Sequence, residues 1–240
     1  MVFKMKSVST LAVLTLASAI ATSSHRDEKY SLRWTSPPDR VSYRLDLKFE
    51  LNADVEGMDK SFGITGNVGA TRIKSYPDGS YTMRFGTKMS EMNKELAPDA
   101  KESVYEATYD KQGNEINRKE IDRTPNSHLS SFMAFDPPTS KVAIGEVWTV
   151  NTSATPPDET TASFGAAQLA GIEMVGGTKC FRVEQVFRAA ASDAKPSLST
   201  VWVRVSDGVV FKMQWSGTFL QLNVQGATVT SKATLKLLEG

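Results

Sequence analysis

The sequence predicts an all-β, mainly antiparallel protein, built as a curved sheet or half-open barrel with one or two short helices. Three observations predict it. Apolar and polar side chains alternate strictly over residues 41–52, similar runs recur in the C-terminal third, and glycine-containing turn sequences separate the runs. Alternation with a period of two gives a strand one dry face and one wet face, whereas a helix would scatter the same residues around its circumference.

The alternating runs of the C-terminal third cover residues 198–206, 209–222 and 229–237. In the first of them, valines alternate with Trp202 and Arg204, so this strand is expected to be apolar on both faces in part. The whole chain offers about ten or eleven strands, many longer than the usual five or six residues. Long antiparallel strands accumulate twist, which favours a bent sheet or half-open barrel, with a two-layer sandwich as the alternative.

Turn sequences occur between the alternating runs, where the chain of an antiparallel meander would reverse direction. Glycine tolerates the positive φ of tight hairpin turns, so Asp-Gly and Gly-Gly between two alternating runs predict a hairpin. The predicted turns are Pro77-Asp78-Gly79, Gln112-Gly113-Asn114, Gly176-Gly177 and Asp207-Gly208.

Two short segments have helical spacing. In residues 88–96, two methionines and a leucine fall on one side, and residues 127–135 repeat such a pattern with Leu129, Phe132 and Met133. Prolines follow both segments and would end them after two or three turns. Each is therefore a candidate short helix.

The N-terminal 21 residues have the features of a secretory signal peptide. Two lysines precede an apolar stretch that ends in an Ala-Ile-Ala sequence, and this stretch is shorter than the roughly 20 apolar residues of a membrane span. We expect residues 1–21 to be cleaved before Thr22, residues 22–29 to form a polar tail, and residues 30–240 to form a single antiparallel β domain. The mature protein is then exported, soluble and periplasmic or extracellular, with no transmembrane segment.

Composition narrows the classes of function. The chain has 28 Lys and Arg against 27 Asp and Glu, which gives a net charge of +1 and argues against non-specific binding of nucleic acid. Cys180 is the only cysteine, and His25 and His128 are the only histidines. Because no phosphate-binding loop, dinucleotide fingerprint or hydrolase motif occurs, we expect no catalytic residue, no metal, no cofactor and no enzymatic activity.

Two weaker constellations have simpler interpretations. Residues 52–57 resemble the start of a calcium loop, but Gly63 stands where the bidentate glutamate would be, which favours a polar hairpin loop. A nucleophilic pair of Cys180 and His128 is less favoured than a semi-buried structural cysteine and a histidine near a helix N-terminus.

Aromatic side chains at strand positions are the most suggestive group. On the concave face of a curved sheet they can line a pocket for an apolar ligand, and plain core packing is the alternative for each of them. The candidates for such a lining are Tyr43, Trp148, Trp202, Phe211, Trp215 and Phe219.

Residues 135–150 are the most distinctive segment. Their prolines are followed by the pattern Val142-x-x-Gly145-Glu146-x-Trp148, which resembles a family of bacterial exported proteins of uncharacterised function. The later Gly-x-x-Cys and Asp-Gly sequences are similar to that family as well. The resemblance implies an exported β protein and no assigned site. In architecture alone, the long antiparallel strands also resemble the periplasmic lipoprotein-carrier fold, an unclosed barrel that holds acyl chains.

These observations favour a non-catalytic exported or periplasmic protein that binds or carries an apolar ligand, a lipid or an acyl chain. The alternative is a structural or protein-interaction module of the cell envelope, with a filled core and an envelope protein as its partner. An enzyme would need carboxylate, lysine or tyrosine chemistry that only the fold could assemble.

Overall fold

The computed structural model describes residues 28–34, 38–52, 60–89, 103–122, 135, 137–152, 163–189, 196–218 and 229–238. All regular structure in these ranges is β-strand. The strands are β1 (Lys29–Tyr30), β2 (Arg40–Leu51), β3 (Ser61–Ser75), β4 (Tyr81–Met89), β5 (Ser103–Tyr109), β6 (Glu115–Asp122), β7 (Val142–Ala143), β8 (Val147–Thr152), β9 (Ser163–Val175), β10 (Thr178–Ala189), β11 (Ser197–Arg204), β12 (Val210–Thr218) and β13 (Val229–Leu238).

Eleven strands form one sheet in the order β6-β5-β4-β3-β2-β13-β12-β11-β10-β9-β8. Each neighbouring pair is antiparallel, and the pairing of β2 with β13 joins an N-terminal meander to a C-terminal one. Strands β6 and β8 are the two edges, so the sheet is not closed, while β1 and β7 form a separate pair. The predicted all-β antiparallel fold, a curved sheet or half-open barrel, is confirmed.

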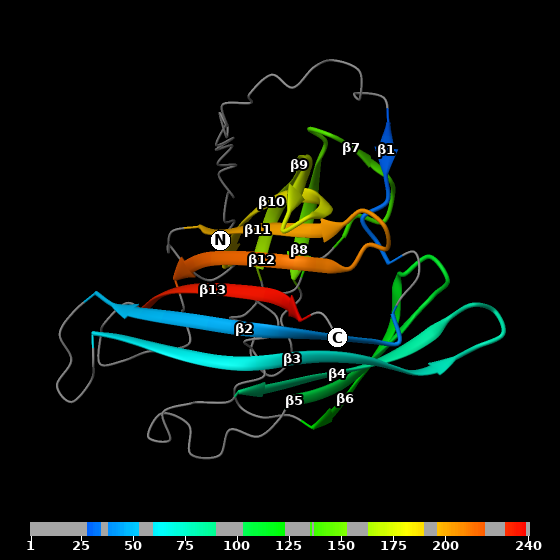
Figure 1. Cartoon of the computed structure of the whole chain (residues 1–240), viewed down its shortest axis with the longest axis horizontal. Coiled ribbons are helices and arrows are strands. Elements are labelled where there is room, and N and C mark those ends of the chain that lie inside the picture. Colours follow the sequence, from blue (N-terminus) through cyan, green and yellow to red (C-terminus); the bar gives the residue numbers. More distant parts are fainter. Residues whose placement is uncertain are drawn as a thin grey trace, which may run out of the picture.

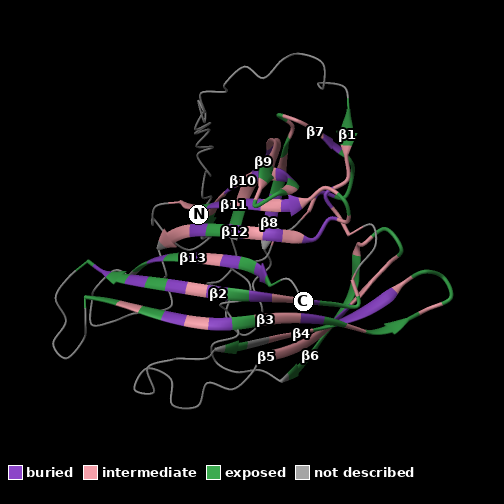
Figure 2. Ribbon diagram, in the orientation of Figure 1, coloured by how far each residue is buried: buried purple, intermediate pink, exposed green. Residues whose placement is uncertain are grey.

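Strand β2 shows why this sequence forms a sheet with two different faces. Buried and non-buried residues alternate without interruption along this strand (Figure 2). Leu45 at its centre is fully buried, while Arg44 and Lys48 are exposed. The apolar face gains free energy by leaving water, and the charged face stays hydrated. The alternation of apolar and polar residues over 41–52 therefore corresponds to the alternation of buried and non-buried side chains in β2.

The predicted turns are present. Gly79, Gly113, Gly176, Gly177 and Gly208 all have positive φ, which non-glycine residues rarely adopt. Gly208 has a second constraint, because a Cβ atom there would overlap the carbonyl of Arg33. The turn between β11 and β12 thus lies directly against the N-terminal segment.

The sheet is twisted and irregular. Its register shifts at Arg72 in the β3–β4 pairing, at Arg182 in the β9–β10 pairing and at Trp202 in the β11–β12 pairing. Such bulges bend a strand and increase its local twist. Figure 1 shows the result: β2, β3, β12 and β13 run across the view, whereas β8 and β9 run steeply.

The segment before β2 is fixed to the sheet by Leu32 and Arg33. The Leu32 side chain is fully buried, and the Arg33 guanidinium donates hydrogen bonds to the carbonyl oxygens of Gly113, Pro137 and Pro138 at 2.9, 3.1 and 2.8 Å. These acceptors lie in the β5–β6 turn and in the segment before β7. Arg33 therefore ties three distant parts of the chain together.

Two expectations concern segments that are described only in part. A helix over residues 88–96 cannot begin at Lys88, because Lys88 and Met89 continue β4 and pair with Asn67 and Gly66 of β3. Residues 90–96 and 127–134 lie outside the described residues, and Phe135 is not helical.

The expected signal peptide and most of the polar tail, residues 1–27, also lie outside the described residues. Among the residues that are described, no helix is long and apolar enough to cross a membrane.

Candidate functional site

The inner face of the sheet is defined by a row of register partners that runs across β2, β13, β12, β11, β10 and β9. Every member of the row is apolar and buried, so the row forms a continuous core. Its members are Leu45, Leu235, Met213, Val201, Val183 and Leu169.

A second inner-face row lies two residues further along the strands and extends to β8. It differs from the first because it mixes aromatic, small and polar side chains. Its members are Leu47, Ala233, Trp215, Ser199, Gln185, Ala167 and Trp148.

Four of the six aromatic residues predicted as a lining lie on the inner face. Trp148 and Trp215 belong to the second row, and Phe211 and Tyr43 belong to the same buried core. Burial raises the pKa of the Tyr43 phenol well above its ordinary value. Phe219 lies outside the described residues.

Trp202 lies on the opposite, outer face. Its indole N–H donates to Oε1 of Glu173 at 2.5 Å, and Nζ of Lys212 lies 4.9 Å from the centre of its ring. Glu173 also pairs with Arg182 at 3.6 Å. Trp202 thus belongs to a polar network, and the structure does not bring it together with Trp148 and Trp215.

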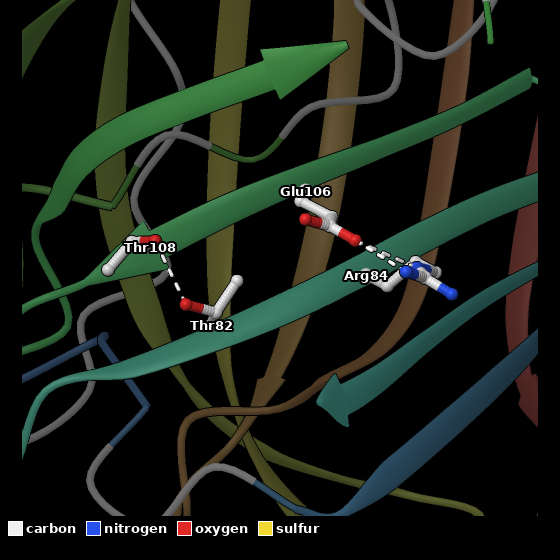
Figure 3. A network of polar contacts seen from close by, with 4 residues as sticks. All are labelled: Thr82, Arg84, Glu106 and Thr108. Carbon is white, nitrogen blue, oxygen red and sulfur yellow. Dashed lines mark hydrogen bonds and ion pairs between the residues drawn. The ribbon is translucent and has the colours of Figure 1, made fainter. Parts of the chain in front are cut away.

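The outer face of the N-terminal meander carries similar cross-strand pairs. Arg84 on β4 donates to Glu106 on β5 at 2.6 and 3.0 Å, and the hydroxyl oxygens of Thr82 and Thr108 lie 3.0 Å apart (Figure 3). Such pairs contribute up to about 1 kcal/mol each and fix the strand register. They are structural pairs with satisfied polar atoms.

Aromatic rings fill the end of the sheet near the β5–β6 hairpin. The rings of Phe85 and Tyr105 stack with centroids 4.7 Å apart, and those of Tyr81 and Tyr109 stack at 5.4 Å. Burial raises the pKa of Tyr81 to about 12. This end of the sheet is a packed aromatic core.

Gln185 is the unexpected residue of the inner face. It is only 2% exposed, and both its amide nitrogen and its amide oxygen lack a hydrogen-bond partner among the described residues. Its register partner Ser199, 5% exposed, and the indole Nε1 of Trp148 are buried and unpartnered in the same sense. Other buried polar atoms of this kind belong to Tyr81, Arg182 and Ser231.

Gln185 is not among the lining residues predicted from the sequence, although its position carries a local signal. Gln185 stands between Val183 and Phe187 at the position where the alternation calls for an apolar residue. Burying an amide without a partner destabilises a protein by about 1–3 kcal/mol, so a polar residue on the dry face of a strand needs an explanation.

Cys180 has the environment of a structural thiol. It is fully buried, and burial raises its pKa to about 11, so it is protonated at neutral pH. The histidine considered as its partner, His128, lies outside the described residues, as do residues 53–59 of the calcium-like loop. Within the described ranges no group of His, Cys, Asp and Glu could hold a metal ion.

Comparisons with known proteins give little guidance. No family model matches this chain, and no curated protein matches its sequence. Among solved structures, a DUF1329 family protein from Desulfovibrio piger is similar at 8% identity, over 85% of this chain and 86% of that chain, with a TM-score of 0.22.

Two further structures are similar to the same degree. A LolA superfamily protein from Nitrosomonas europaea has 10% identity, 87% coverage of each chain and a TM-score of 0.22. A putative outer membrane lipoprotein-sorting protein domain from Vibrio parahaemolyticus has 9% identity, coverage of 83% of this chain and 86% of that chain, and a TM-score of 0.20. TM-scores this low carry no information about function.

Proposed function

We propose that the protein is a non-catalytic, exported binding or carrier protein that holds a lipid or acyl chain against the inner face of its sheet. One observation carries this proposal. The buried side chains on the inner face of an unclosed eleven-stranded sheet are mostly apolar, and none of them is charged over the described parts of β2 and β9–β13. The sequence resemblance to exported proteins supports the location.

An open sheet suits a long ligand. Because neither β6 nor β8 pairs with a second neighbour, the two edges can move apart without breaking any strand pairing. An acyl chain could then enter from the side, and each methylene group that leaves water would contribute about 0.8 kcal/mol. Even after the costs of immobilisation, a chain of about twelve methylene groups would bind measurably.

The first test is native mass spectrometry of the mature chain, residues 22–240, purified from an exporting bacterial host and followed by lipid extraction. The proposal predicts a lipid at near-stoichiometric amount, or uptake of a fluorescent fatty acid by the lipid-free protein. A lipid-free protein that takes up no such probe would contradict it.

Two tryptophan variants form a matched pair for the same assay. Trp215→Phe changes the inner face and should weaken binding of the acyl probe several-fold, because it removes apolar contact area. Trp202→Phe removes the same atoms from the outer face. It should leave the affinity for the acyl probe within twofold of the wild-type value. Equal effects of the two substitutions would contradict the assignment of the ligand to the inner face.

A second candidate function is a protein-interaction module of the cell envelope. It is favoured by exposed apolar side chains on both edge strands, namely Ile116 and Ile121 on β6 and Val147 on β8. Unpaired edges with apolar side chains can accept a strand from a partner. Cross-linking in intact cells should then capture an envelope protein at these edges, and its loss on Ile116→Lys would support a contact there.

A further inference from the structure

Three unpartnered polar side chains of the inner face belong to one register row: Gln185, Ser199 and Trp148, on β10, β11 and β8. Gln185 and Ser199 are direct register partners, and Trp148 follows on the other side with Ala167 between. Adjacent strands are about 4.8 Å apart, so the group spans about three strand spacings. The small Ala167 side chain is the register partner of both Trp148 and Gln185 and stands between them in this row.

The hydrogen-bonding capacity of this group is specific. Nε1 of Trp148 can only donate, the amide of Gln185 offers donors and an acceptor, and the hydroxyl of Ser199 can do either. None of these buried atoms has a partner among the described residues. The row therefore holds three potential donor groups that have no partner among the described residues.

The charged residues closest to Gln185 along β10 face away from these donors. They are Glu184, Arg182 and Arg188, which alternate to the outer face, and Nη2 of Arg182 lies 3.6 Å from Oε1 of Glu184. A buried carboxylate without a cation is strongly disfavoured, whereas a neutral carbonyl oxygen accepts hydrogen bonds at little cost. The donors therefore match an uncharged acceptor that is attached to an apolar chain.

We propose that Gln185, Ser199 and Trp148 form a polar subsite that binds the carbonyl group of an acyl ester. This inference rests on the proposed function and makes it more specific: the ligand is an esterified acyl chain, such as a glycerolipid, and not a hydrocarbon or a free fatty acid. The chain lies along the apolar rows, and the ester carbonyl fixes its position. The unpartnered amide of Gln185 is then a binding group of the protein.

Three fluorescent probes test the subsite. All carry pyrene at the far end of the same dodecyl chain, and their near end is a methyl ester, a carboxylate or a methyl group. The wild-type chain should bind the ester at least tenfold more tightly than the alkane, which is the gain expected from one or two buried hydrogen bonds. It should also bind the ester more tightly than the carboxylate.

Substitutions then assign the preference to residues. Gln185→Leu should reduce the ester-to-alkane ratio to threefold or less and leave the alkane affinity unchanged. Gln214→Leu is the matched control, because Gln214 lies exposed on the outer face of β12, and it should keep the full ratio. Ser199→Ala, a smaller change, should reduce the ratio by about half and keeps the test valid if Gln185→Leu does not fold.

The outcomes separate the two proposals. If the alkane binds and the wild type shows no preference for the ester, the subsite is overturned while the apolar binding site stands. Tightest binding of the carboxylate, or an unchanged ratio in both Gln185→Leu and Ser199→Ala, also overturns the subsite. If no probe binds, the proposed function fails and the subsite with it.

Discussion

Two polar pairs of register partners, one on the outer face of the sheet and one on its inner face, behave differently. Thr82 and Thr108 are register partners on β4 and β5, and their hydroxyl groups lie 3.0 Å apart (Figure 3). Gln185 and Ser199 are register partners on β10 and β11, and neither has a hydrogen-bond partner among the described residues. Thr82, Gln185 and Ser199 are buried, and Thr108 is partly buried. The hydroxyl groups of the first pair hydrogen-bond to each other, whereas the polar groups of the second pair remain without a partner on a largely apolar face.

The difference shows how buried polar residues can be sorted into structural and functional ones. A satisfied pair adds stability and fixes register, so its removal should harm the fold. An unsatisfied pair destabilises the protein without ligand, so its presence on an apolar face is explained by a role in binding. Unfolding measurements on single variants can test this distinction, and four predictions follow in order of decreasing effect.

Leu45→Ala measures how much one buried side chain of the apolar row contributes to the free energy of unfolding. Leu45 is fully buried at the centre of β2, and its replacement should lower the free energy of unfolding by about 3 kcal/mol through lost burial and a cavity. Urea unfolding followed by circular dichroism measures it. A loss below about 1 kcal/mol would show that the inner-face rows are loosely packed. Gln185 and Ser199 could then not be compared with Thr82 and Thr108 as residues of an equally well-packed sheet.

The stability of the protein at alkaline pH tests the burial of the Cys180 thiol, to which we assign no role in binding. The pKa of Cys180 is raised from its ordinary value of 9.0 to about 11 by burial, so the unfolded chain loses the thiol proton first. Its contribution to stability is full below pH 9 and is lost as the pH rises to 11, by about 2–3 kcal/mol.

The measurement is the difference between wild type and Cys180→Ala, since other groups titrate in the same range. Between pH 9 and pH 11 the wild type should lose about 2 kcal/mol more than the variant. Parallel stability curves for the two proteins would show that the thiol is not buried.

Thr82→Val removes one member of the satisfied pair. The side chain keeps its shape, but the hydroxyl of Thr108 loses its partner, and Tyr76 loses a weaker contact at 3.4 Å. The free energy of unfolding should fall by about 1–2 kcal/mol. Denaturant unfolding measures it, and an unchanged or higher stability would remove the contrast between the two pairs.

Gln185→Leu is the counterpart on the unsatisfied pair, with the opposite sign. Replacing an unpartnered buried amide with an apolar side chain of similar size should raise the free energy of unfolding of the ligand-free protein by about 1 kcal/mol. The same denaturant measurement applies. A destabilisation of 1 kcal/mol or more would mean that the amide already has a partner within the protein, and the proposed subsite would lose its basis.

Much of the fold could be predicted because alternation and turn chemistry are local. The strand over residues 41–52 and the turn at Asp207-Gly208 needed only the periodicity of burial and the positive φ of glycine. Strand order was not available in this way, because the pairing of β2 with β13 joins residues far apart in the chain. The sequence predicts a helix that starts at Lys88, whereas Lys88 and Met89 pair with β3, a contact that is also non-local.

The candidate site shows the same limit. Trp202 and Trp215 were grouped by residue type, yet Trp202 alternates with two buried valines, which already separated it from the dry face of its strand. That Trp148, Gln185 and Ser199 share one row depends on register between three hairpins, and a sequence does not contain register explicitly. The polar residue at an apolar position of β10 was the one local signal.

Fluorescence quenching by a brominated alkane at saturating concentration tests the central claim most directly, because bromine quenches tryptophans close to it and an alkane does not depend on the Trp148 donor. Two variants would each keep one tryptophan, Trp215 on the inner face or Trp202 on the outer face, with the other three replaced by phenylalanine. The account predicts strong, saturable quenching of Trp215 and little quenching of Trp202. Equal quenching of both, or stronger quenching of Trp202, would contradict the placement of an acyl ligand on the inner face.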